Sequence, residues 1–268
     1  MVPLRLALIA LLIGLGSAQA QMVGRQLVEN VEGPDGQSRR VIFLLPPEPV
    51  GAVLLFPGGD GVVGIGRAGF VRYEENFLVR TRALWRSENL AVALPDSPGG
   101  VSLLGHRSSP DFADAAASIL ARLRVLTGTV PIFLVGTSQG STGAVNLAAS
   151  LPPGRIAGLV LTSSITQPNS GGETVYDAHP DRVTVPTLVV THAADTCRLS
   201  PPAAVPKIFA ALKRAPRRDG LSITAHSPVR EAACGAFAPH GYLDAEGTTV
   251  RQITAWMRAA VPSMQPRP

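Results

Sequence analysis

The sequence is poor in cysteine and in aromatic side chains. Of its 268 residues only two are cysteines, and 5% are aromatic. No Cys/His group has the spacing of metal ligands, so we expect neither a metal site nor a cofactor. Aromatic residues are also too few to predict a broad aromatic surface for carbohydrate.

Charge of one sign is not concentrated anywhere in the chain. The formal net charge is +5, but the arginines are scattered, so nucleic acid is not an expected partner. Arg80, Arg82 and Arg86 have helical spacing, which is typical of a solvated helix face. An anion-binding site is the alternative for these three side chains.

Long hydrophobic runs are missing as well. One positive charge, Arg5, precedes the apolar run 6–15, and Ser-Ala-Gln-Ala at 17–20 has the small-x-small pattern of a cleavage site. A membrane-spanning helix needs about 20 apolar residues, and no other segment approaches that length. Residues 1–20 are therefore predicted to be a signal peptide, with a retained membrane anchor as the alternative. The mature protein is expected to be soluble, without a membrane span, and periplasmic or extracellular.

The remaining residues, 21–268, contain no internal repeat and no long polar linker, so we expect one domain. Export would carry Cys197 and Cys234 into an oxidising compartment, where a disulfide is the expected state. Closing a loop of this size stabilises a fold by about 4 kcal/mol in the chain-entropy model. Two unpaired buried thiols are the alternative.

Short apolar runs alternate with helical stretches along the chain. The predicted strands cover residues 25–31, 39–45, 52–56, 90–94, 132–135, 156–161, 187–191 and 221–225. The predicted helices cover 73–86, 111–126, 141–149, part of 203–214, and 248–260. A Gly-Pro-Asp-Gly turn at 33–36 predicts an antiparallel hairpin from the first two strands. The later alternation predicts the α/β class, with a mostly parallel, doubly wound sheet.

The segment Gly136-Thr137-Ser138-Gln139-Gly140 stands between a predicted strand and a predicted helix. A strand that turns sharply into a helix can expose a serine only if its neighbours are small, which explains the flanking glycines. The N–H groups and the positive dipole end of the helix then favour an oxyanion near the serine. This pattern predicts a nucleophile elbow.

With this motif and this order of elements, the chain resembles the α/β-hydrolase superfamily over nearly all of residues 21–268. The superfamily order of serine, acid and histidine implies Ser138 as nucleophile, Asp195 after a late strand as acid, and His240 before the last helix as base. Asp195 could instead cap a turn. The less well placed candidates are Asp177, Asp181 and Asp219 for the acid, and His106, His179, His192 and His226 for the base.

The resemblance also implies an oxyanion hole. One donor is the N–H of Gln139, and the other comes from the loop after the third strand, with Gly59 preferred and Gly58 second. The superfamily commonly has a histidine where this chain has Pro57. A Gly-rich turn without a catalytic role is the alternative. A phosphate-binding loop is disfavoured because no Gly-Lys-Ser/Thr follows.

Residues 164–186, where many members of the superfamily insert a cap, are rich in turn-forming residues and are predicted to be a loop. An open site of this kind favours short acyl esters or the chain end of a bulky polymer. The sequence predicts an exported serine hydrolase that cleaves small-molecule or polymeric carboxylic esters. A peptidase or amidase, an acyltransferase, and a non-catalytic binding protein of the same fold are the alternatives, and no feature predicts an oligomeric state.

Overall fold

A computed structural model describes residues 24–264, and the predicted signal peptide lies outside them. The described chain forms one sheet of eight strands in the order β1-β2-β4-β3-β5-β6-β7-β8. The strands are β1 Arg25–Glu32, β2 Ser38–Leu45, β3 Gly51–Phe56, β4 Leu90–Pro95, β5 Ile132–Thr137, β6 Gly158–Thr162, β7 Thr187–His192 and β8 Arg218–Ile223. The pairs β1–β2 and β2–β4 are antiparallel, and all other neighbours are parallel.

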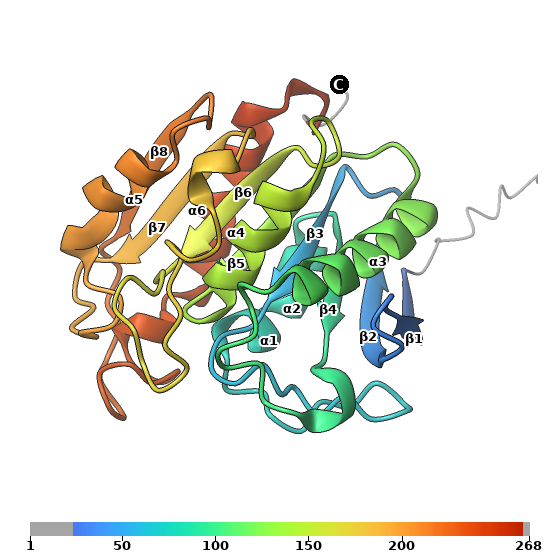
Figure 1. Cartoon of the computed structure of the whole chain (residues 1–268), viewed down its shortest axis with the longest axis horizontal. Helices are drawn as coiled ribbons and strands as arrows, with labels where there is room; N and C mark the ends of the chain where they lie inside the picture. Colours follow the sequence, from blue (N-terminus) through green and yellow to red (C-terminus); the bar gives the residue numbers. More distant parts are fainter. Residues whose placement is uncertain (1–23, 265–268) are drawn as a thin grey trace, which may run out of the picture.

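Helices cover both faces of this sheet (Figure 1). They are α1 Phe77–Arg80, α2 Arg82–Ser87, α3 Pro110–Thr127, α4 Gly140–Ser150, α5 Val205–Ala211 and α6 Glu246–Ala260. Apolar residues of α3, α4 and α5 pack in one core cluster with one face of the strands, and those of α1, α2 and α6 pack in a second cluster with the other face. The central strands are buried on both sides, which explains why they are continuous apolar runs.

The predicted fold class is confirmed, including the N-terminal antiparallel hairpin. The prediction of one helix over 73–86 is wrong, because the structure begins a helix at Phe77 and interrupts it at Thr81. The Thr81 hydroxyl donates to the carbonyl of Phe77 at 2.7 Å and accepts the indole N–H of Trp85 at 3.1 Å. Such back-bonding by threonine competes with the regular helix and bends it.

Strand β8 was also predicted incompletely, since it begins at Arg218 rather than at residue 221. It is the edge strand, and its residues alternate between more and less exposed positions. An edge strand contains fewer apolar residues than a central one, so its start gives a weaker signal in the sequence.

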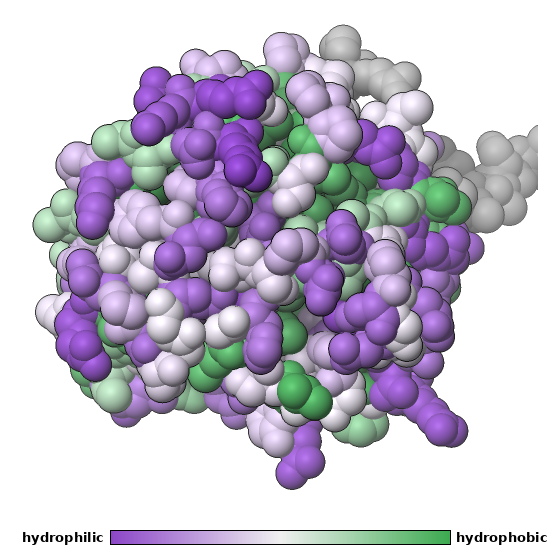
Figure 2. Space-filling model, in the orientation of Figure 1, coloured by the Kyte–Doolittle hydropathy of each residue, from purple (hydrophilic) through white to green (hydrophobic). Residues whose placement is uncertain are grey.

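On the face drawn in Figure 2, hydrophilic side chains surround small apolar patches. Within residues 24–264, no helix combines the length and the apolar character needed to cross a bilayer.

Candidate active site

The turn between β5 and α4 holds Ser138 in a left-handed backbone conformation, with φ of 51°. A non-glycine residue adopts such a φ only where its surroundings impose it. Close packing on both sides of the turn holds Ser138 in this conformation. A Cβ on Gly140 would lie 1.9 Å from the carbonyl oxygen of Phe56, and one on Gly136 would lie 2.7 Å from the Cα of Ser141. The flanking glycines therefore let α4 start directly against the end of β3, with Ser138 partly exposed above the sheet.

The candidate residues meet because their strands are neighbours. Strands β3, β5, β6 and β7 are adjacent and parallel, so their carboxyl ends lie along one edge of the sheet. The Gly58 and Gly59 loop follows β3, Ser138 follows β5, and Asp195 follows β7. His240 reaches the same edge from the loop between β8 and α6. Sites in parallel sheets form at this edge.

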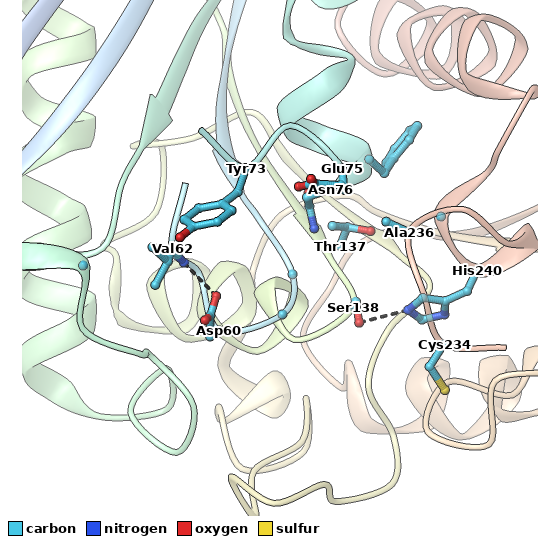
Figure 3. A pocket seen from close by; sticks show the side chains of 15 residues that line it. Asp60, Val62, Tyr73, Glu75, Asn76, Thr137, Ser138, Cys234, Ala236 and His240 are labelled. Atoms are coloured by element: carbon cyan, nitrogen blue, oxygen red, sulfur yellow. Dashed lines mark hydrogen bonds between the residues drawn. The ribbon is translucent and has the colours of Figure 1, made fainter. Parts of the chain in front are cut away.

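The three side chains predicted as a triad form one continuous hydrogen-bonded chain. The Ser138 Oγ lies 3.0 Å from His240 Nε2, and His240 Nδ1 lies 3.1 Å from Asp195 Oδ2. Figure 3 draws the first of these bonds at the edge of a pocket. The Asp195 side chain is 1% exposed and that of His240 is 5% exposed, so the pair is withdrawn from water.

The Asp195 carboxylate is compensated by donors on its own loop. Its Oδ1 accepts the N–H of Cys197 at 2.8 Å, and the Ser200 hydroxyl lies 3.4 Å from Oδ2. The same hydroxyl is 2.9 Å from His240 Nδ1, so Ser200 contacts both members of the pair. A buried carboxylate needs such partners, because an unpaired buried charge is costly.

The backbone around His240 is fixed from the sheet. The Ser163 hydroxyl, directly after β6, donates to the His240 carbonyl at 2.8 Å. The Tyr242 hydroxyl donates to the carbonyl of Val190 in β7 at 3.0 Å. Burial raises the pKa of Tyr242 well above its ordinary value, so this phenol stays protonated and remains a donor.

The loop after β3 packs directly against Ser138. A Cβ on Gly58 would lie 2.9 Å from the Cβ of Ser138, while Gly59 has a φ of 62° and open space around it. Neither the N–H of Gly59 nor that of Gln139 donates to another described residue. Both candidate donors therefore keep a free N–H beside Ser138.

A buried arginine, Arg107, is hydrogen-bonded to the loop after β3. The Arg107 side chain donates to the carbonyl of Pro57 at 3.3 Å. Burial lowers the pKa of Arg107 to about 10, against the opposing effect of Glu173 and Asp60. The guanidinium stays charged at neutral pH, so a fixed positive charge lies under the glycine loop.

The predicted disulfide is confirmed: Cys197 is bonded to Cys234. Cys197 is buried two residues after Asp195, whereas Cys234 is exposed and lies six residues before His240. The bond therefore joins the acid loop directly to the histidine loop.

The pocket beside Ser138 has a volume of about 460 Å³. Its walls come from the segment between β3 and α1, which contributes Tyr73, Glu75 and Asn76, and from residues 234–241 (Figure 3). The connection from β6 to β7 contains only a single short 3-10 turn, Pro180–Arg182, and none of its residues lines this pocket. The expected absence of a folded cap between β6 and β7 agrees with this arrangement.

The other candidates lie elsewhere. The side chains of His106, His179 and His226 are exposed, and the buried His192 contacts the carbonyl of Ala225 at 3.0 Å. Asp177 bonds to Thr174, and Asp219 accepts the indole N–H of Trp256. In the described part of the chain, no three His, Cys, Asp or Glu side chains are grouped as a metal site would require.

Sequence reasoning missed Ser200, Ser163, Tyr242 and Asn76. Ser200 follows Asp195 by five residues and could have been considered, but serines are frequent in loops. Asn76 stands directly before an apolar helical stretch, which is an N-cap signal, yet it falls inside the helix predicted over 73–86. The contacts of Ser163 and Tyr242 join segments far apart in the sequence, so no local pattern reveals them.

No protein-family model and no curated protein matches this sequence. Solved structures do match its fold. A dienelactone hydrolase from Anabaena variabilis is 14% identical, with a TM-score of 0.61 over 88% of this chain and 98% of that one. An esterase from Pyrococcus furiosus is 11% identical, with a TM-score of 0.61 over 87% and 92% of the two chains. A cold-adapted esterase from an Arctic intertidal metagenomic library is 16% identical, with a TM-score of 0.57 over 90% and 97%. The TM-scores show that these proteins share the fold of this chain, and at sequence identities this low the matches show the fold alone.

The close packing of Gly140 makes a direct prediction. Gly140→Ala places a methyl group against the carbonyl of Phe56 and should lower the free energy of unfolding by at least about 2 kcal/mol. The matched control is Gly247→Ala in α6, where the new methyl meets only the end of the Arg251 side chain and should raise helix stability slightly. Urea unfolding of both variants measures the two effects, and equal midpoints would contradict the packing argument.

The disulfide makes a second prediction. We expect reduction, or Cys234→Ser, to lower turnover under conditions where the protein remains folded, because the acid and histidine loops lose their covalent link. Stability should also fall, by about 2 to 4 kcal/mol. Initial rates and circular dichroism recorded on the same reduced sample separate the two effects. Turnover of Cys234→Ser equal to that of the wild type would refute this role of the bond.

Proposed function

Because this chain has the α/β-hydrolase fold, we propose that it is a serine hydrolase that cleaves carboxylic esters. Ser138 attacks the acyl carbon while His240 Nε2 takes the hydroxyl proton, and the leaving alcohol receives that proton as the acyl-serine forms. Water then attacks the acyl-serine through the same base and releases the acid. Asp195 holds the tautomer of His240 and stabilises its protonated form.

One observation carries this proposal. Hydrogen bonds connect Asp195 to His240 and His240 to Ser138, and Ser138 lines a pocket. A serine alone is a poor nucleophile, and a base within hydrogen-bond distance activates it. The free N–H groups of Gln139 and Gly59, with Gly58 as the alternative, are the proposed donors to the oxyanion. The reaction as proposed requires no metal or cofactor.

The pocket supports a substrate with a short acyl group, or a polymer chain end, because its walls are loops and its volume is about 460 Å³. A peptidase or an amidase would use the same residues, and amide substrates in parallel with esters distinguish these activities. An acyltransferase would turn over faster when an alcohol or amine is added. A non-catalytic binding protein would show neither turnover nor acylation.

We also propose that the protein acts after export. The disulfide supports this proposal, because such bonds persist in oxidising compartments. The segment that would direct export, residues 1–20, lies outside the described residues.

The acyl-serine predicts a burst. The mature form, beginning at Gln21, should release one equivalent of nitrophenol rapidly from p-nitrophenyl butyrate before slower steady turnover. Ser138→Ala should abolish the burst and lower turnover by at least about 10³-fold. Stopped-flow absorbance measures both. A wild-type protein with neither burst nor turnover on esters or amides would contradict the proposed function.

The charge of the pocket predicts substrate preference. Among the described residues that line it, Asp60 and Glu75 are acidic and none is a lysine or an arginine. A p-nitrophenyl ester with a terminal carboxylate on its acyl chain should therefore show a kcat/KM about 10-fold below that of p-nitrophenyl butyrate, because like charges repel. The Glu75→Gln variant and added salt should both narrow this difference. Equal kcat/KM values for the two esters in the wild type would refute the charge effect.

A further inference from the structure

Asn76 is held with its amide in a fixed orientation. It is the N-cap of α1, and its Oδ1 accepts the N–H of Leu78 at 3.0 Å. Turning the amide over would place its NH₂ against another N–H, so the oxygen stays on the helix side and the nitrogen faces away from the helix. Figure 3 shows this nitrogen directed from the pocket wall toward Thr137 and Ser138.

The amide of Asn76 and the side chain of Ser138 both lie close to the position that a side chain on Gly58 would occupy. A Cβ built on Gly58 would lie 2.9 Å from the Cβ of Ser138 and 3.1 Å from the Nδ2 of Asn76. No described residue accepts a hydrogen bond from Nδ2, although Asn76 is only partly exposed and lines the pocket. A free donor is thus directed at the space in which an acyl group on Ser138 would lie.

We propose that Asn76 is a further oxyanion-binding residue. This inference rests on the proposed function and adds a donor that the sequence pattern did not assign. The N–H of Asn76 Nδ2 donates to the oxygen of the tetrahedral intermediate at Ser138, together with the backbone N–H groups of Gln139 and Gly59. Asn76 forms no covalent bond and transfers no proton. Its hydrogen bond strengthens as negative charge develops on that oxygen.

The position of Asn76 is tied to that of the base. The Arg80 side chain donates to the carbonyl of Glu75, next to Asn76, and to the carbonyl of Gly241, next to His240. Its Nε also pairs with Glu246 at the start of α6, at 2.9 Å. In addition, the ring of Phe77 packs against that of Tyr242, with centroids 4.8 Å apart. The amide and the histidine loop are therefore held by shared partners, which keeps the donor in place before the substrate arrives.

A donor that acts on the developing oxyanion should affect kcat more than KM. Asn76→Ser keeps a side-chain oxygen that can cap α1 but removes the N–H, so we expect kcat on p-nitrophenyl butyrate to fall about 10- to 100-fold with KM little changed. Asn76→Asp also keeps the cap but places a negative charge beside the oxyanion, so its kcat should fall further.

The control for loss of a helix cap is Ser109→Ala. Ser109 caps α3 by accepting the N–H of Phe112 at 3.2 Å, and it lies outside the pocket. This variant should lose some stability and keep the wild-type kcat. Thermal unfolding of every variant is measured to check that each one is folded at the assay temperature. Binding of a trifluoromethyl ketone, whose adduct with serine carries an oxyanion, should weaken in Asn76→Ser by the same factor as kcat.

Two results would overturn the inference while the proposed function stands. The first is a wild-type kcat in a folded Asn76→Ser protein. The second is a raised KM with unchanged kcat, which would make Asn76 a residue that binds the ground-state substrate. A wild-type protein with neither a burst nor turnover on esters or amides would overturn the proposed function and this inference with it.

Discussion

The close approach between the start of α4 and the end of β3 is the constraint on which the rest of the site depends. Gly140 lies against the carbonyl of Phe56 with no room for a Cβ, and a Cβ on Gly58 would likewise be too close to the side chain of Ser138. These two contacts fix the separation between the turn that carries the serine and the loop that carries the candidate oxyanion donors. A side chain at either glycine would move one set of groups away from the other. Residues of the smallest size are therefore required at this junction for geometric reasons.

Burial of the acid imposes a second requirement. The carboxylate of Asp195 is almost fully withdrawn from water and must be stabilised by hydrogen bonds. Its donors come from the next few residues of the same loop, the N–H of Cys197 and the hydroxyl of Ser200, and from His240 across the site. Because Cys197 also forms the disulfide, the residue whose N–H stabilises the Asp195 carboxylate is covalently tied to the loop that carries His240. Any movement of the histidine loop would then disturb the environment of the carboxylate.

The sequence predicted those parts of the site that depend on local pattern and chain order. The glycines around Ser138, the strand before Asp195 and the loop before the last helix are local signals, and the adjacent parallel strands explain why these segments meet. The pocket walls were not predicted. They come from the segment before α1, whose helix was expected to begin at residue 73, and from residues 234–241. Contacts of Arg80, Ser163 and Tyr242 that span much of the chain hold these segments in place. Such contacts depend on packing in three dimensions, which no local periodicity records.

Charged side chains hold the loops of the site in a way that apolar packing could not. The carboxylate of Asp96, just after β4, accepts the N–H groups of Val63 and Ile65 at 2.8 and 2.7 Å. The guanidinium of Arg107 binds the carbonyl of Pro57, and that of Arg80 binds the carbonyls of Glu75 and Gly241. Charge-assisted hydrogen bonds are strong and directional, so each restrains the orientation of a peptide group as well as its distance. None of these bonds uses the N–H of Gly59 or the amide N–H of Asn76, which donate to no other described residue. A loop held only by apolar contacts could rotate its peptide planes at little cost, and an oxyanion would then meet donors that must first reorganise.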